Sequence, residues 1–235
     1  MRKTLLAMAM GAAILPGIAA AQSQPPPRIV VMGEGEAVAP PDMALLSLSV
    51  MREAKTAREA LDANNDAMAA VISAMKGFGI EERDLQTAGI QINPRYNYEN
   101  KPDGSQTAEL VAYQVTNTLS IRVRDLQKTG EIIDRSVSLG VNQGGSVSFA
   151  NDDPSTVIAQ AREKAVADAF TKAKTLSKAA GVSLGRVLEI SEQNSAPPPG
   201  PIMAKAMPFD SREAVPIQAG ENAYRVQVNV VFELR

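Results

Sequence analysis

The clearest pattern in the chain is a strict alternation of apolar and polar residues close to its C-terminal end. Apolar residues at every second position are separated by polar ones, with Val231 as the one apolar residue on the polar side. This period of two predicts a long strand with one buried face. The apolar positions are Tyr224, Val226, Val228, Val230, Phe232 and Leu234. The same alternation or a short apolar run predicts further strands at 28–32, 46–50, 85–93, 111–123, 147–149 and 188–190.

A second pattern, with spacings of three and four residues, predicts a long helix after Pro154. Its apolar stripe consists almost entirely of small residues, so a sheet could approach this helix closely. The stripe comprises Ala161, Ala165, Ala169, Ala173, Leu176 and Ala180, and the polar positions expected to face water are Lys164, Asp168, Lys172, Lys174 and Lys178. Pro154 suits the first helical position, and either Asp152 or Asp153 is the expected cap.

Two more helices are expected, one over 53–75 and a shorter one after Asp125. Their predicted inward faces comprise Ala57, Leu61, Met68, Ile72 and Met75 in the first, and Leu126, Ile132, Ile133 and Val137 in the second. We interpret Met68 and Met75 as core residues rather than ligands, and we expect Asn64-Asn65-Asp66 to be exposed. Gly79, Gly140 and Gly181 each follow a helix and should end it in the left-handed conformation.

Together the elements follow the order β-β-α-β-β-α-β-α-β-β. This order predicts an α+β fold, a mainly antiparallel or mixed sheet packed with three helices. Residues 94–107 are rich in turn residues and are expected to form a hairpin loop. Residues 196–220 include Pro197-Pro198-Pro199-Gly200-Pro201 and show no periodicity, so they are expected to form a long loop or arm.

The N-terminal segment 1–21 has the features of a secretory signal peptide. Arg2 and Lys3 are followed by an apolar stretch to Ile18 and by Ala19-Ala20-Ala21, a small-residue cleavage site. Cleavage near Ala21 would leave residues 22–235, a length that suits one large domain or two small lobes. The chain has no cysteine, so neither a lipoprotein anchor nor a disulfide is available. The expected location is therefore the bacterial periplasm, with outer-membrane association possible.

Composition excludes several kinds of chemistry. The chain has no histidine and no cysteine, which rules out Ser-His-Asp catalysis, Cys-His catalysis and thiolate metal sites. A net charge of −2 argues against nucleic acid as a partner. Aromatic residues make up 4% of the chain and tryptophan is absent, so sites that stack sugars or bases are not expected.

The remaining candidate residues each have a simpler structural explanation. Gly33-Glu34-Gly35-Glu36 lacks the third glycine of a phosphate loop and carries two acids, so a glycine-bent strand is the preferred interpretation. Met203 and Met207 are spaced like copper ligands but have no His or Cys beside them. Tyr96 and Tyr98 could form a contact patch or pack at a strand end.

Carboxylates and arginines give the last candidates. Asp152-Asp153 could be a carboxylate pair, but a helix cap explains it. Glu189 and Glu192 need only solvent. Arg122 and Arg124 share one strand face, where an anion could bind, although a solvated or salt-bridged face is the simpler interpretation. We therefore assign no catalytic, cofactor-binding or metal-binding residue from the sequence.

Several stretches resemble SIMPL-domain proteins over nearly the whole of residues 22–235. They are Gly33-Glu34-Gly35 with Pro41-Asp42-Met43-Ala44, the run from Ala161 to Val187, and Gly220-Glu221-Asn222 leading into Val226–Glu233. Three more stretches are closest to one particular member of that family: 55–60, 84–87 and 139–145. The resemblance implies an exported α+β protein without known enzymatic activity. It also implies an association with oxidative-stress defence and, in close relatives, large ring-like or channel-like oligomers.

The sequence therefore leads to one main hypothesis and two rivals. The main hypothesis is a periplasmic, non-enzymatic protein that assembles with itself into a homo-oligomer larger than a dimer and has an envelope or stress-related role. The first rival is a monomeric module that binds a small ligand or a peptide. The second is a hydrolase that uses carboxylates, which requires two acidic residues converging in a pocket.

Overall fold

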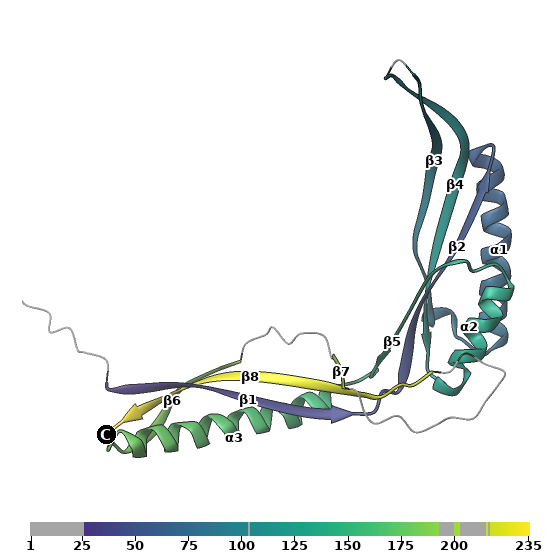
Figure 1. The fold of residues 1–235 in the computed structure, drawn as a ribbon. Coiled ribbons are helices and arrows are strands. Elements are labelled where there is room, and N and C mark those ends of the chain that lie inside the picture. Colours follow the sequence, from purple (N-terminus) through teal and green to yellow (C-terminus); the bar gives the residue numbers. More distant parts are fainter. Residues whose placement is uncertain (1–25, 103, 193–199, 203–214, 216) are drawn as a thin grey trace, which may run out of the picture.

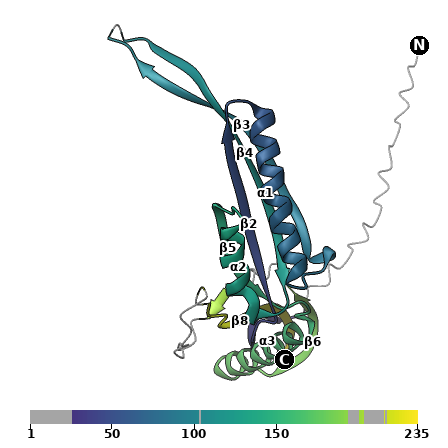
Figure 2. The same ribbon diagram turned by 90° about the vertical axis from the view of Figure 1, so that its right-hand side faces the viewer.

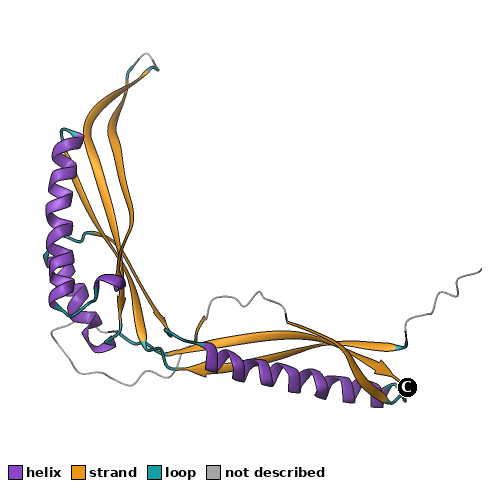
Figure 3. Ribbon diagram, turned by 180° about the vertical axis from the view of Figure 1, so that it is seen from behind, coloured by secondary structure: helices purple, strands orange, loops and turns teal. Residues whose placement is uncertain are grey.

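The protein is an L with two arms, each built from one antiparallel sheet and the helices on one of its faces (Figure 1). The computed structural model describes residues 26–102, 104–192, 200–202, 215 and 217–235. The predicted signal peptide, Met203, Met207 and most of the predicted arm at 196–220 lie outside these residues. Helices line the outer side of the L and the bare faces of both sheets line its inner side (Figure 3).

The first arm, here the α3 arm, contains both ends of the described chain. Its sheet has the order β1-β8-β6, and β7 also pairs with β8. The strands are β1 (Arg28–Ala39), β6 (Leu184–Glu192), β7 (Gly200–Ile202) and β8 (Glu221–Leu234), and the helix is α3 (Ser155–Ala179). All pairings in this arm are antiparallel.

The second arm, here the α1 arm, has the sheet order β3-β4-β2-β5, again with antiparallel pairs only. Its elements are β2 (Met43–Ala54), α1 (Ala57–Gly77), β3 (Leu85–Asn100), β4 (Gln106–Val123), α2 (Thr129–Ser138) and β5 (Gln143–Ala150). Short 3-10 turns at Glu82–Asp84 and Leu126–Lys128 precede β3 and α2. The predicted fold class and element order are confirmed, and the three-residue β7 is the addition.

Helix ends follow local capping rules. Thr56 and Glu59 form a capping box, in which each side chain accepts from the other residue's backbone N–H at 3.2 Å. The helix therefore starts at Ala57, later than predicted, because β2 continues through Ala54. The predicted left-handed glycines are confirmed at Gly79, Gly140 and Gly181, with φ of 85°, 113° and 72°.

The core of the α1 arm lies between α1 and the sheet. Met68, Val71 and Met75 are buried against strand residues such as Leu46 and Ile121, so Met68 and Met75 are core residues as predicted. The expectation that Asn64 is exposed is wrong. Its side chain is fully buried and its Nδ2 donates to Val50 O at 2.8 Å and Val115 O at 3.1 Å, which ties the helix to β2 and β4.

Small residues allow α3 to lie directly on its sheet. The buried positions recur every four residues, at Ala161, Ala165, Ala169, Ala173 and Ser177. Leu176, which we placed on this stripe, is 51% exposed, and Ala180 is exposed as well. The repeat of four differs from the 3.6 residues of an ideal turn, so the extrapolated stripe drifted away from the true contact face.

Gly33 and Gly35 do not bend β1, contrary to the preferred interpretation of these glycines. The register with β8 is unbroken from Arg28 to Ala39. A Cβ built on Gly33 would lie 2.0 Å from Ala165 O, and one on Gly35 would lie 2.0 Å from Ala161 O. The two glycines therefore provide the space that the backbone of α3 occupies.

Two further expectations are corrected at the outer parts of the α1 arm. Residues 94–100 belong to β3 and pair with β4, which begins at Gln106, so the loop expected over 94–107 is wrong for 94–100. Pro94 is tolerated because β3 is an edge strand, where a missing N–H can face solvent. Val137 is 59% exposed on α2, whereas Ile132 is fully buried as predicted.

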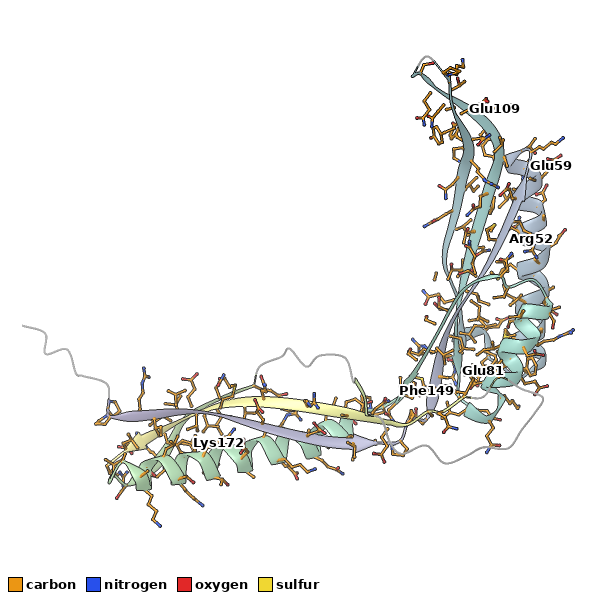
Figure 4. The ribbon with its side chains drawn as sticks, in the orientation of Figure 1. Arg52, Glu59, Glu81, Glu109, Phe149 and Lys172 are labelled. Atoms are coloured by element: carbon orange, nitrogen blue, oxygen red, sulfur yellow. The ribbon has the colours of Figure 1, made fainter. Side chains whose placement is uncertain are left out.

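A polar cluster holds the two arms together at the elbow. Asn151 Oδ1 accepts from Tyr224 OH at 2.8 Å and from Asn222 Nδ2 at 3.1 Å. Asn151 Nδ2 donates to Pro40 O at 2.7 Å, and Asn222 also donates to Phe149 O at 3.2 Å. Burial raises the pKa of Tyr224. Figure 4 places Phe149 where the arms meet, so these bonds connect β8 of one arm to β5 of the other.

Candidate functional site

Arg124 is the centre of a charged cluster that includes Asp84 and Asp152. Arg124 and Asp152 are candidate residues from the sequence, whereas Asp84 is not. Arg124 Nε and Nη2 donate to the two carboxylate oxygens of Asp84 at 3.0 and 3.3 Å, and its Nη1 donates to Asp152 at 2.6 Å. The Asp84 side chain is 4% exposed. The Arg124 guanidinium, chiefly by hydrogen bonding, lowers the pKa of Asp152. The cluster joins three segments and has the character of a structural salt bridge.

Asp152 and Asp153, considered as a carboxylate pair in the sequence analysis, bind different partners. Asp153 Oδ1 accepts from the backbone N–H of Ser155 at 3.0 Å, and hydrogen bonds from the side chain and the backbone of Ser155 lower the Asp153 pKa. The N-cap of α3 is Pro154 and has no side-chain cap hydrogen bond, so the prediction that Asp152 or Asp153 caps the helix is wrong. Asp152 instead binds Arg124. The helix begins at Ser155 with Pro154 as the residue before it, one position later than predicted. The two carboxylates are therefore committed to separate partners, which does not support their use as a catalytic acid–base pair.

We predict that Arg124→Met lowers the free energy of unfolding at about pH 7, because Asp84 would stay buried without its cation. The lowered pKa of Asp152 means that its stabilising effect is present above the usual carboxyl range and is lost as the pH falls. The difference between variant and wild type should therefore shrink toward about pH 3. Urea denaturation at both pH values measures this.

Arg58→Met is the matched control for that experiment. The ion pair of Arg58 with Asp62 leaves the two side chains 78% and 60% exposed, and exposed pairs contribute little to stability. Equal stability of the two variants at neutral pH would contradict the structural role of Arg124.

The other candidate residues lie at different places in the structure and form no common site. Glu192 binds Arg162 at 2.6 and 3.1 Å, which lowers the pKa of Glu192, and Glu189 pairs in register with Val231. Tyr96 and Tyr98 are 45% and 59% exposed, so the contact-patch interpretation is favoured over packing. Within the described ranges, no group of three or more acidic residues is arranged to hold a metal ion.

The edge of β1 is covered by side chains of α3. Three residues spaced four apart on the helix meet backbone groups spaced two apart on the strand, since both spacings are about 6 to 7 Å. Lys164 Nζ donates to Glu36 O at 2.8 Å, Asp168 Oδ2 accepts from Glu34 N at 2.9 Å, and Lys172 Nζ donates to Met32 O at 3.0 Å. Figure 4 shows Lys172 directed toward the strand. Lys164 and Lys172 are exposed as predicted, and the hydrogen bonds to β1 are contacts that the sequence pattern did not predict.

The β3 edge of the α1 arm is different. All residues of this 16-residue strand except Leu85 are exposed. Ile90, Ile92, Tyr96 and Tyr98 are 45–59% exposed along it, and Leu110 of β4 is 45% exposed. Figure 2 shows the β3–β4 hairpin extending past the N-terminal end of α1. An exposed apolar edge strand is a surface that another chain can pair with.

The bare face of the α1 sheet contains a depression of about 310 Å³ near the elbow. It is lined mostly by polar side chains from all four strands and from the turn before β3. These are Ser47, Arg83, Asp84, Gln86, Ser120, Arg122, Ser146 and Ser148, with Leu45, Leu46 and Ile121 also present. Sequence reasoning found Arg122 but missed the hydroxyl groups, because they become neighbours only through strand pairing.

Residues 29–232 match the SIMPL family, described as "Protein of unknown function (DUF541)". The match spans most of the sequence, so the chain belongs to the SIMPL family, as its resemblance predicted. No helix in the described part of the chain is long and apolar enough to cross a membrane.

Two relatives place the chain within that family. The chain is 52% identical over 237 residues to the 26 kDa periplasmic immunogenic protein of Brucella melitensis, covering 97% of this chain and 94% of the relative. This is the member that the stretches 55–60, 84–87 and 139–145 resemble, and the resemblance is confirmed. The chain is also 30% identical to the uncharacterized protein YggE of Escherichia coli K12, covering 97% and 92%. Neither name assigns an activity.

Proposed function

We propose that this protein is an exported, non-enzymatic periplasmic protein that assembles into a homo-oligomer larger than a dimer. The observation that carries the proposal is the free β3 edge, with its exposed apolar side chains. Export is supported by the signal-peptide pattern of residues 1–21 and by the name of the Brucella relative. The envelope or oxidative-stress role rests on the resemblance to SIMPL-domain proteins.

The edge strands of the two sheets differ in how well they could pair with a strand of another copy. β1 is blocked along its middle by Lys164, Asp168 and Lys172. β5 has 8 residues and β6 has 9, whereas β3 has 16. Between its two register shifts β3 pairs regularly from Gly89 to Arg95. Ile90 and Ile92 lie in this regular segment, which makes it the favoured place for a second copy to add a strand.

A particle larger than a dimer needs a second contact surface. A groove of about 420 Å³ lies between the start of β1 and the end of α3. It includes Val30, Met32 and Leu176, which are 59%, 45% and 51% exposed. Val231, the one apolar residue on the polar side of β8, is opposite Val30 in the register. It therefore lies beside this groove. We propose that another copy covers this groove.

Assembly is tested by size-exclusion chromatography with multi-angle light scattering. The wild-type protein should have the mass of a discrete oligomer larger than a dimer. Ile90→Lys plus Ile92→Lys places two charges on the edge and should reduce that mass, because lysines on an edge strand prevent pairing. Circular dichroism should be unchanged, since both side chains are exposed.

Val137→Lys is the matched control, because Val137 is exposed to the same degree but lies on α2. It should leave the particle mass unchanged. A wild-type protein that stays monomeric at micromolar concentration would reject the assembly proposal and favour the monomeric binding module. An oligomer that persists in the double lysine variant would assign assembly to another surface.

A further inference from the structure

The depression on the bare face of the α1 sheet brings together polar groups that have no structural task. Strand pairing places Gln86, Ser120, Ser47 and Ser146 in one row across all four strands. In the next row Arg122 and Ser148 flank Leu45. Side chains in a row share one face of a sheet, so these groups converge on the same surface, on the inner side of the L (Figure 3).

Hydrogen bonding leaves the central groups of this surface available. Among the residues that the structure describes, Arg122 makes no ion pair or hydrogen bond, and the hydroxyls of Ser47, Ser120, Ser146 and Ser148 have no hydrogen-bond partner. The next row away from the elbow differs, because there Ser49 and Thr118 bond to each other at 2.8 Å. The depression therefore has donors and acceptors that the fold does not use.

Arg122 is the one cation lining the depression that has no carboxylate partner among the described residues. The one carboxylate of the depression, Asp84, is occupied by Arg124 through two hydrogen bonds. Arg83 is held at the rim by Glu81 at 2.8 Å. The pKa of Asp152 is lowered mainly by Arg124 and further by the charges of Arg122 and Arg83, so all three arginines lie at this end of the sheet. An anionic group is the partner that this arrangement favours.

We propose that this depression binds a small hydroxylated anion of the class of sugar acids and sugar phosphates. Arg122 holds the anionic group, since a guanidinium suits carboxylate and phosphate oxygens equally. The serine row and Gln86 bond the hydroxyl groups. Four strands span about 14 Å, longer than a bare phosphate, and the volume of about 310 Å³ suits a monosaccharide-sized ligand. No aromatic side chain lines the depression, so recognition is by hydrogen bonds rather than stacking.

The test is isothermal titration calorimetry of the purified protein with D-glucuronate and with glucose 6-phosphate. At least one should bind with a Kd of about 1 mM or tighter, and the stronger of the two identifies whether carboxylate or phosphate is preferred. Arg122→Gln should weaken binding at least about tenfold, the effect of one lost charge-assisted hydrogen bond. Ser47→Ala plus Ser120→Ala should weaken it severalfold without changing the charge.

Arg58→Gln is the control, because it removes an equally positive side chain from the far side of the arm. It should leave binding unchanged, and neutral glucose should not bind. Absence of binding by both anions, or equal binding by the Arg122 and Arg58 variants, would overturn the proposal. Inorganic phosphate binding as tightly as either sugar anion would overturn the role of the serine row. Arg122→Gln should not alter particle mass, so the outcome is independent of the assembly proposal.

Discussion

Replacing Gly35 with alanine should strongly destabilise the α3 arm. The new Cβ would lie 2.0 Å from Ala161 O and 2.4 Å from Ala165 N. Both are helix backbone atoms, which cannot move aside as a side chain can. Overpacking costs about 1–3 kcal/mol and more where the backbone must shift, so we expect a loss of about 3 kcal/mol or more in the free energy of unfolding. Gly33→Ala added to it should increase the loss.

The control for this experiment is Gly77→Ala at the end of α1. A Cβ there meets nothing within 4 Å, and alanine is the better helix former. Urea denaturation should therefore find this variant as stable as the wild type or slightly more stable. A Gly35→Ala protein as stable as the control would mean that α3 does not contact β1 as the structure shows.

Elements with one buried face were predictable from the sequence, because burial leaves a local pattern. The alternation from Tyr224 to Phe232 predicted β8 and its buried face, and the glycines at 79, 140 and 181 predicted three helix ends. The division into two sheets was not predictable in this way. It depends on which strands pair, such as β1 with β8 across most of the chain, and neither strand carries a signal for its partner.

The predictions of element boundaries and buried faces were wrong at positions where two physical preferences favour different structures. The small-residue stripe of α3 was correct to Ala173, after which Leu176 was preferred as apolar over the buried Ser177. Pro94 was interpreted as the end of a strand, whereas an edge strand tolerates it. The capping box of Thr56 and Glu59 was a signal available in the sequence, and using it would have placed the start of α1 correctly.

The sequence also could not predict which charged side chains of the candidate site are paired. The expectation that Arg122 and Arg124 share one strand face is wrong, because β4 ends at Val123 and Arg124 lies just beyond it. Only the fold shows that Arg124 is neutralised by Asp84 and Asp152 while Arg122 is left unpaired. These partners are separated from Arg124 by 40 and 28 residues, so composition and spacing gave no means of distinguishing the two arginines.

Replacing Phe232 with alanine should destabilise the α3 arm by a different mechanism, the loss of packed volume. Phe232 is 1% exposed and its ring meets Phe170 edge-on, with the ring centroids 4.9 Å apart. The other residues around it include alanines, which cannot extend into the space. A buried Phe→Ala change costs about 3–5 kcal/mol, and a core with few large side chains should place this one near the upper end.

Val231→Ala is the neighbouring control, on the opposite face of the same strand. Its side chain is only half-buried, so its loss should cost far less in a urea melt. The two variants also separate stability from assembly, because Val231 lies beside the groove that we propose another copy covers. We expect Phe232→Ala to lower the free energy of unfolding at any protein concentration. Val231→Ala should act mainly on the oligomer mass at low concentration, and a larger loss of stability from it than from Phe232→Ala would contradict the assignment of buried and bare faces in β8.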